Sequence, residues 1–191
     1  MYILIFDTET GGVNAEENDI LQLSYQVYDT TAQKTIKAID RFFPWPEDKS
    51  RVTERAIEVN GLTEEYLATK ELSKRIDALK EFYEDMDKCD YIVAHNGNFD
   101  KRFISVTTER EGLIPNIEWK PMIDTMITTT DLCKLPPHPG KEGYKWPKLI
   151  ELAEFLKVNT DDINLHDSSA DVELTKRCFL HLLREGFYKL Q

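Results

Sequence analysis

Two carboxylate residues, Asp7 and Glu9, lie at the end of an apolar segment that opens the chain. Residues 1–6 (MYILIF) are branched and aromatic, which predicts a short strand buried on both faces. Alternate strand residues point the same way, so the two carboxylates would lie side by side, roughly 6–7 Å apart along the strand. A divalent cation would relieve their repulsion. A charged exit from the strand into a loop explains the pair equally well, so both interpretations stay open.

A third carboxylate, Asp100, follows another apolar segment. Residues 90–95 (DYIVAH) predict a strand, the chain turns at Asn96-Gly97, and a helix is expected from Phe99 to Glu111. Asp100 would lie in the first turn of that helix, where an acidic residue commonly complements the helix dipole. That role needs no metal, so Asp100 alone is ambiguous.

The segment from His166 to Asp171 carries the same ambiguity. Ser168 or Ser169 can cap a helix expected over 169–185, which places Asp171 in its first turn and His166 in the loop before it. An exposed histidine beside a dipole-complementing aspartate is one interpretation. The other is a general base that works near neutral pH, held on a loop next to a rigidly placed carboxylate.

Taken together and in this order, these segments resemble the DEDDh group of 3′–5′ exonucleases in the DnaQ-like superfamily. That superfamily includes the proofreading (epsilon) subunits of bacterial DNA polymerase III. The stretch FDTETGG is similar to the first motif, AHNGNFDKRFI to the second and LHDSSADVELT to the third. The resemblance covers nearly the whole chain, because three intervening stretches also match: IEVNGLTEEYL, Asp124-Thr125, and Pro139-Gly140-Lys141 with the helix that follows.

The resemblance implies a metal-dependent catalytic centre. By their positions in the motifs, the metal ligands would be Asp7, Glu9, Asp100 and Asp171, which would bind two Mg²⁺ or Mn²⁺ ions. His166 would accept a proton from the attacking water. The implied reaction is hydrolysis of the terminal phosphodiester of nucleic acid, with DNA favoured, releasing nucleoside 5′-monophosphates from the 3′ end.

Two alternatives remain beside that reaction. An RNA-trimming or oligoribonucleotide exonuclease would have the same fold, and nothing in the sequence separates ribose from deoxyribose. A non-catalytic module docked on a polymerase is the other alternative. Such a module would be expected to lose metal ligands, whereas all five motif positions are present in this chain.

Four residues near the motifs are candidate substrate contacts. The resemblance suggests that Thr10 and Gly11 offer backbone N–H groups to the terminal nucleotide. His95 and Asn96 end the strand of the second motif, and His95 serves either structural hydrogen bonding or substrate contact. The family often has Thr-Gly-Leu or Thr-Thr-Gly after the glutamate, whereas this chain has TGGV at 10–13. The apolar residue that wedges near the terminal base is therefore shifted or lost.

One loop combines cations with aromatic residues. Residues 134–147 (KLPPHPGKEGYKWP) are rich in Pro and Gly, and Lys148 follows them. Lysines mixed with tyrosine and tryptophan are typical of a grip on single-stranded nucleic acid, through phosphate contacts and base stacking. Lys141 and Trp146 are therefore candidate substrate contacts. A solvated loop with Trp146 packed into the core is the competing interpretation.

The predicted elements describe an α/β fold. Short connections make the first three strands an antiparallel meander. The order of elements predicts a mixed five-stranded sheet, three antiparallel strands and then parallel strands, flanked by helices. The resemblance implies that this is the ribonuclease H-like fold. Strands are expected over 1–6, 20–29, 35–43 and 90–95 and before Asp124, and helices over 54–60, 71–88, 99–111, 147–157 and 169–185, with a further turn at 63–65.

Composition and charge limit the remaining possibilities. With 191 residues, we expect a single exonuclease domain, residues 1–191. The net charge of −11 argues against a broad basic surface, but not against a metal site that contacts a few nucleotides. Weak affinity for polyanions suggests a short single-stranded 3′ end as substrate, or delivery by a partner such as a polymerase. No tail is evident after the last helix, so we expect a stand-alone exonuclease; the oligomeric state stays open.

Cysteine usage and hydropathy indicate the compartment. The sequence has no stretch of membrane-spanning length and no visible signal peptide. Cys89, Cys133 and Cys178 lack CxxC spacing, which predicts reduced and buried thiols. We therefore expect a cytoplasmic protein without a membrane partner.

Overall fold

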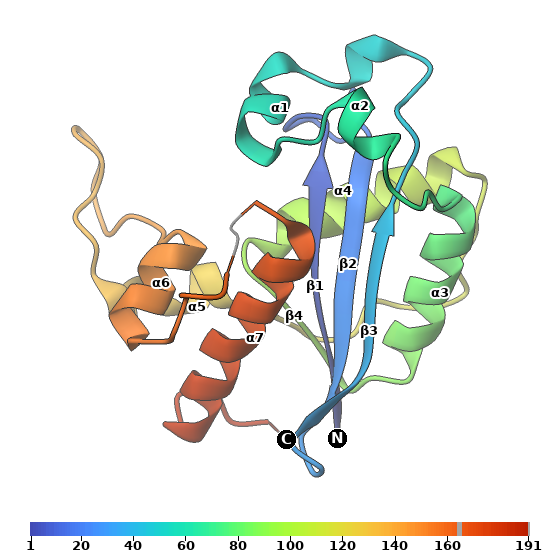
Figure 1. The fold of residues 1–191 in the computed structure, drawn as a ribbon. Coiled ribbons are helices and arrows are strands. Elements are labelled where there is room, and N and C mark those ends of the chain that lie inside the picture. The colour runs from blue at the N-terminus through green and yellow to red at the C-terminus, as the bar shows by residue number, and fades with distance from the viewer. Residues whose placement is uncertain (164–165, 191) are drawn as a thin grey trace.

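The computed structural model describes residues 1–163 and 166–190 and contains a five-stranded mixed sheet (Figure 1). The strands lie in the order β3-β2-β1-β4-β5 across the sheet. Their bounds are β1 (Tyr2–Thr10), β2 (Ile20–Asp29), β3 (Lys34–Phe42), β4 (Tyr91–Ala94) and β5 (Met122–Asp124).

Strand β1 lies at the centre of the sheet and carries the first two carboxylates. It pairs antiparallel with β2 and parallel with β4, while β3 and β5 extend the sheet at its two sides. Side chains of residues 3–6 are fully buried, as the apolar segment predicts. The register with β2 shifts between Glu9 and Thr10, where β1 ends. The mixed five-stranded sheet predicted from the sequence is confirmed.

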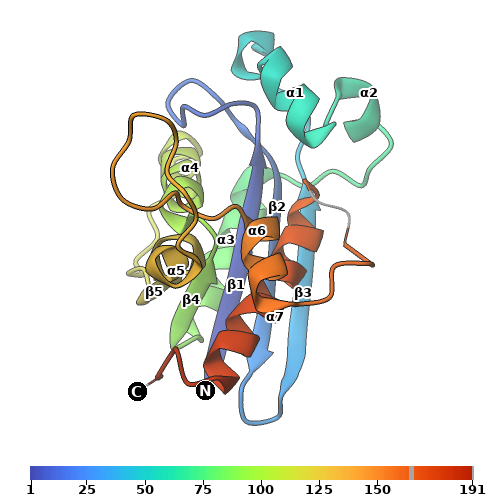
Figure 2. The same ribbon diagram turned by 90° about the vertical axis from the view of Figure 1, so that its left-hand side faces the viewer.

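Helices cover both faces of this sheet (Figures 1 and 2). One face packs against α3 and α4, in a core that includes Leu4 and Phe6 of β1. The other face packs against α7, where Ile3 and Ile5 are buried. Helices α5 and α6 pack on α7 in a further cluster. The helix bounds are α1 (Glu54–Asn60), α2 (Glu64–Leu67), α3 (Arg75–Asp87), α4 (Gly97–Arg110), α5 (Thr125–Cys133), α6 (Leu149–Leu156) and α7 (Ser168–Arg184), with a 3₁₀ turn at Lys49–Arg51.

The predicted start of α3 is wrong by four residues. The helix begins at Arg75 instead of Glu71. The preceding residues are extended, because Leu72 forms a bridge with Phe42 and the Ser73 N–H donates to the Phe42 carbonyl (2.8 Å). A contact distant in sequence therefore overrides the helical spacing of the apolar residues.

Three other differences have local causes. Helix α4 begins two residues early, at Gly97, because Asn96 adopts a left-handed backbone (φ +71°) and caps it. Helix α6 begins at Leu149, after an extended Lys148, so Pro147 lies outside it. Helix α5 is not expected from its sequence, TMITTTDLC, because β-branched threonines are weak helix formers. The Asp124 side chain supports it by accepting from two backbone N–H groups of its first turn.

The three cysteines are buried and free, as the sequence predicts. No helix formed by residues 1–163 or 166–190 is both long and apolar enough to span a bilayer.

Candidate active site

Three predicted metal ligands converge at the end of β1. Asp7 and Glu9 project from the same side of the strand, and Asp171 approaches them from the first turn of α7. One carboxylate oxygen from each lies within 4.8 Å of the other two. Residues 162 positions apart in the sequence are therefore brought to the spacing at which a single cation can contact all three.

Asp100 lies beside this group, in the first turn of α4. Its Oδ1 accepts hydrogen bonds from the backbone N–H and the hydroxyl of Thr8 (3.0 and 2.7 Å). The side chain is almost completely buried, and its charge acts on Asp7. Thr8 thus joins α4 to β1 between the two carboxylates that flank it in the strand.

The start of α7 is fastened to the sheet by Ser168. Its hydroxyl donates to the Asp7 carbonyl (2.8 Å), and its N–H donates to the side chain of Gln22 on β2 (3.3 Å). Asp167, and neither of the serines expected in that role, is the N-cap of α7; its side chain accepts from the Ser169 N–H (2.9 Å). These bonds fix the register at which Asp171 reaches β1.

Burial raises the pKa of all four carboxyl groups, and repulsion by neighbouring carboxylates adds to the effect. Burial, then Asp100, raises the pKa of Asp7 well above its ordinary value. Burial, then Asp171, raises the pKa of Glu9 to about 8. Burial also raises the pKa of Asp100 to about 7, against the two bonds from Thr8, and that of Asp171 to about 6.

These residues fit a divalent cation. The donors are carboxylate oxygens, the ligands that Mg²⁺ and Mn²⁺ prefer. Among the described residues, Asp171 Oδ1 is buried without a hydrogen-bond partner, which normally costs free energy. An added positive charge would satisfy this oxygen and offset the burial and the neighbouring negative charges that raise the four pKa values.

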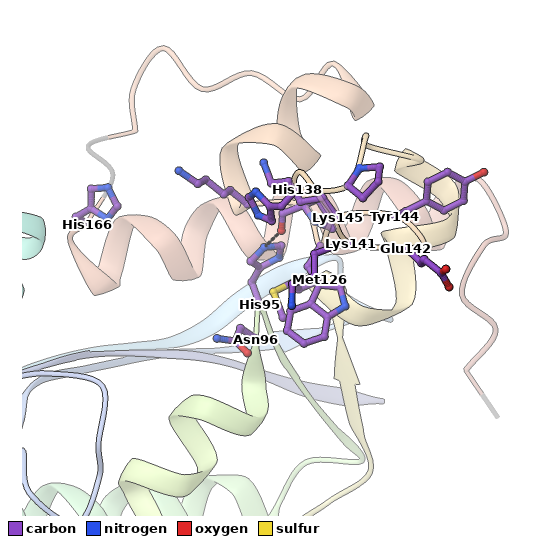
Figure 3. Close-up of a pocket in the computed structure, with 13 residues that line it drawn as sticks. His95, Asn96, Met126, His138, Lys141, Glu142, Tyr144, Lys145 and His166 are labelled. Atoms are coloured by element: carbon purple, nitrogen blue, oxygen red, sulfur yellow. Dashed lines mark hydrogen bonds between the residues drawn. The ribbon is translucent and has the colours of Figure 1, made fainter.

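His166 lies on the exposed loop just before α7. Its backbone N–H hydrogen-bonds the Asp171 carboxylate, and its backbone is left-handed (φ +67°), a conformation that non-glycine residues adopt at a cost. Its ring stands apart from the other labelled residues of the cavity in Figure 3. Its immediate neighbour Leu165 and Asn164 fall outside the described residues.

A cavity of about 650 Å³, here called the strand-end cavity, opens on one side of the carboxylates and includes Glu9 and Thr10. The Gly11 N–H, a predicted donor to substrate, donates to the Asp19 carbonyl (2.8 Å) instead. The Thr10 hydroxyl donates to the Gly12 carbonyl (2.6 Å). These bonds hold the turn after β1 in shape, and a substrate contact by Gly11 would have to break one of them.

The Gly11-Gly12 pair is explained by crowding. A Cβ on Gly11 would lie 2.3 Å from the Arg51 carbonyl, and a Cβ on Gly12 would lie 2.3 Å from Asn18 Oδ1. The first apolar side chain after these two glycines is that of Val13. Val13 is 87% exposed at the cavity, and Val59 of α1 lines it as well.

A second cavity, of about 960 Å³ and here called the loop cavity, opens on the other side (Figure 3). Residues 134–148 supply most of its lining, and His166 lines it too. Trp146 is 61% exposed, which excludes the interpretation that packs it into the core. Lys141 is exposed and also lines the cavity.

His95 and Asn96 lie in the wall of the loop cavity. Both ring nitrogens of His95 have protein partners: Nδ1 is 2.9 Å from Thr125 Oγ1, and Nε2 is 2.9 Å from the Pro147 carbonyl. The side chain of Asn96 is exposed, while its backbone N–H donates to Asp124 (3.1 Å). Of the two, Asn96 has the side chain more accessible to a substrate.

The sequence interpretation overlooks Asn60. It predicts this residue only as the last before a glycine helix stop, but its side chain hydrogen-bonds Glu9 and lowers the pKa of that group. Asn60 Nδ2 also donates to the Thr10 carbonyl (3.1 Å). The only available signal is the family-like stretch IEVNGLTEEYL around it, which gives no role for a particular side chain.

Comparisons with known proteins show the family and the fold. The RNase_T family model, described as Exonuclease, matches residues 4–179. DNA polymerase III PolC-type from Streptococcus pyogenes serotype M18 (strain MGAS8232) is 28% identical over 185 residues, 96% of this chain. The same protein from serotype M1 is 27% identical over 185 residues. The chain spans 11% of the length of these relatives.

Solved structures share the fold at low sequence identity. E. coli Exonuclease I in complex with a dT13 oligonucleotide has a TM-score of 0.75 and 18% identity, over 96% of this chain and 41% of that one. The nuclease domain of 3′hExo, described as a DEDDh family member bound to rAMP, has a TM-score of 0.71 and 18% identity, over 97% of this chain and 92% of that one. The sheet is thus the ribonuclease H-like one implied by the motifs, and the chain belongs to the RNase_T exonuclease family.

Proposed function

We propose that this protein hydrolyses the terminal phosphodiester at the 3′ end of single-stranded nucleic acid, with DNA favoured, and releases nucleoside 5′-monophosphates. The convergence of Asp7, Glu9 and Asp171, with Asp100 beside them, is the observation that carries this proposal. Membership of the exonuclease family supports the class of reaction.

The four carboxylates would hold two Mg²⁺ or Mn²⁺ ions. When bound, these ions would supply Lewis acidity toward the attacking water and toward the departing 3′ oxygen. Thr8 and Ser168 keep the carboxylates in place, through their bonds to Asp100 and to the Asp7 backbone. His166 would take the proton of the water from its exposed loop, while the departing oxygen takes a proton from solvent.

The two cavities suggest how a single-stranded nucleic acid would lie on the protein. The terminal nucleoside would occupy the strand-end cavity, where Val13, Val59 and Phe99 offer apolar surface near Glu9. Nucleotides on the 5′ side of the scissile phosphate would cross the carboxylates toward the loop cavity. There Lys141 could pair with a phosphate and Trp146 could stack on a base.

DNA is the favoured substrate because the PolC-type relatives are DNA polymerases and the Exonuclease I structure holds a dT13 oligonucleotide. The same relationship makes a polymerase the partner that we propose. RNA is the second candidate, because 3′hExo, of the same fold, binds rAMP. The side chains that contact a 2′ position would decide between them.

A digestion panel tests the proposal. Matched 5′-labelled oligomers of single-stranded DNA, duplex DNA and RNA would be incubated with Mg²⁺, with Mn²⁺ or with chelator. We expect metal-dependent, stepwise shortening from the 3′ end of the single-stranded DNA and release of 5′-mononucleotides. Faster digestion of RNA would favour the second candidate, and internal cuts or 3′-phosphate products would contradict the proposed reaction.

Two variants separate the roles within the site. Asp7→Ala should abolish digestion under every metal condition. His166→Ala should lower kcat by about 10²–10⁴-fold, the usual contribution of a general base. His181→Ala is the matched control, because this histidine lies in the last turn of α7, far along the helix from Asp171. Full activity of the His166 variant would remove the role assigned to it.

A further inference from the structure

His95 lies in the wall of the loop cavity, and both nitrogens of its ring have hydrogen-bond partners within the protein. Figure 3 shows its ring beside the loop, with a dashed line marking a hydrogen bond. One nitrogen faces Thr125, whose side chain is completely buried, and the other faces the backbone of Pro147. The ring therefore joins the end of β4 to the start of α5 and to the last residues of the cationic loop.

Proton counting fixes the direction of the bond to Pro147. The Pro147 carbonyl can only accept, so Nε2 of His95 must carry the proton. Burial lowers the pKa of His95, which favours the neutral ring at neutral pH, so Nδ1 is an acceptor. The Thr125 hydroxyl has two acceptors within reach of its one proton: Nδ1, at 2.9 Å, and the Ala94 carbonyl, at 3.1 Å.

The bond to Pro147 lies between the two loop residues that are candidates for contact with nucleic acid. Pro147 is buried, whereas Trp146 and Lys148 on either side are exposed and line the cavity. Pro147 lacks an N–H, so its carbonyl is the only backbone group through which this residue can be held. Fixing it orients the backbone from which both neighbouring side chains extend.

The preceding part of the loop has few other bonds to the body of the protein. The Lys145 N–H donates to the Leu135 carbonyl (3.1 Å), and the Lys145 ammonium group pairs with the Glu151 carboxylate. Leu135 belongs to the same loop, and Glu151 belongs to α6. Among the described residues, the His95 side chain joins this end of the loop to the end of β4, while the Lys148 N–H donates to the Glu151 carboxylate of α6 (2.8 Å).

We propose that His95 is a positioning residue: by holding Pro147, it sets Trp146 and Lys148 to receive the nucleotides upstream of the scissile phosphate. This inference rests on the proposed exonuclease function. It predicts that His95 matters for substrates long enough to enter the loop cavity. It should matter little for a substrate that ends at the scissile phosphate.

Two substitutions distinguish the two nitrogens. The amide nitrogen of Gln can reach the place of Nε2 and donate to Pro147, whereas Asn replaces Nδ1 and cannot. His95→Asn and His95→Ala should raise KM for a thymidylate decamer about fivefold, the change expected for one neutral hydrogen bond, with little change in kcat. His95→Gln should restore most of the loss. The aryl ester of thymidine 5′-monophosphate, which has no upstream nucleotide, should show no such rise in KM.

A second measurement does not depend on activity. Limited tryptic cleavage after Lys145, which directly precedes Trp146, should be faster in His95→Asn than in the wild type, and His95→Gln should protect the site. Equal behaviour of the Gln and Asn variants in both assays would overturn the inference, as would equal KM changes for the decamer and the aryl ester. A wild type inactive on both substrates would overturn the proposed function instead, and the tryptic assay would still show whether His95 holds the loop.

Discussion

The carboxylate centre and the cationic loop lie on adjoining parts of the molecule but are built in opposite ways. The centre takes its acidic groups from β1, α4 and α7, and hydrogen bonds from the buried residues Thr8 and Ser168 fasten those elements together. The loop at 134–148 is exposed over most of its length, and its side-chain bond to the sheet comes from His95.

This difference separates two physical requirements. Carboxylates that share a cation must be held to a fraction of an ångström against their own repulsion, which demands rigid, buried supports. A surface that binds successive nucleotides must accept different bases. Exposed aromatic and cationic side chains suffice for this, because stacking and phosphate contacts do not depend on the base. Changes at the centre should therefore affect catalysis steeply, and changes in the loop should affect binding gradually.

The largest of four further effects is expected at Asn60, which supports the centre from outside. Asn60→Ala removes the hydrogen bond to Glu9, and the pKa of Glu9 should rise further. Loss of such an outer support typically costs about 10–100-fold in metal affinity. The Mg²⁺ concentration that gives half-maximal activity should rise by that factor.

Asn159→Ala is the matched control for this variant. Asn60 and Asn159 each accept a hydrogen bond from the backbone N–H two residues later, at Leu62 and Asp161. Only Asn60 also bonds to Glu9. If both variants shift the Mg²⁺ requirement alike, the effect comes from the lost turn and not from the support of Glu9.

A second effect measures the free-energy cost of burying these carboxylates close together without a cation. Because the folded-state pKa values of Asp171, Asp100 and Glu9 are raised, to about 6, 7 and 8, the metal-free folded protein holds protons that the unfolded chain releases. The stability from these groups is full below about pH 4, where the unfolded chain is protonated as well, and is lost as the pH rises from there through the raised pKa values. Each pKa unit corresponds to about 1.4 kcal/mol, and each kcal/mol to roughly 2–4 °C in Tm for a chain of this size.

The measurement is Tm in chelator and in saturating Mg²⁺, at about pH 5.5 and about pH 8.5. The gain from Mg²⁺ should be several degrees larger at the higher pH. Taking the difference between the two conditions cancels the titration of groups elsewhere in the chain. Asp171→Asn should reduce the gain, and a gain independent of pH would contradict the raised pKa values of the buried carboxyl groups.

The sequence predicts the centre better than it predicts the loop. Strand β1 is recognisable because its apolar run is unbroken, and Asp100 and Asp171 are recognisable because each falls in the first turn of a helix after a clear start signal. Local patterns of this kind survive folding. The order of the motifs then connects the segments that carry these carboxylates with one family, although no local pattern shows that the carboxylates converge in space.

The residues that hold the site in place do so through contacts between distant parts of the sequence, which no local pattern can indicate. Leu72 pairs with Phe42 and delays α3, and Asn60 reaches Glu9 across 51 positions in the sequence. The bond from His95 to Pro147 spans 52 positions. The exposure of Trp146 is of the same kind, because a tryptophan after lysine and before proline suits a core or a surface equally well.

The smallest effects should arise in the loop. Trp146→Ala should raise KM for single-stranded DNA by about fivefold, near the lower limit for loss of one base-stacking contact, with kcat and Tm nearly unchanged because the side chain is 61% exposed. Phe187→Ala is the control, as this half-exposed aromatic lies outside both cavities. A fall in Tm without a change in KM would mean that Trp146 serves packing.

Lys141→Gln tests the loop through the salt dependence of its affinity for single-stranded DNA. A lysine that contacts one phosphate of a single strand contributes about 0.7 to the slope of log affinity against log salt concentration. The slope should fall by that amount in the Lys141 variant and stay constant in the Trp146 variant, because stacking releases no counterions. If the slope stays constant in both, the loop binds without phosphate contact at Lys141, and its role narrows to stacking by the aromatic residues. The strand would then be oriented chiefly by its scissile phosphate at the carboxylate centre.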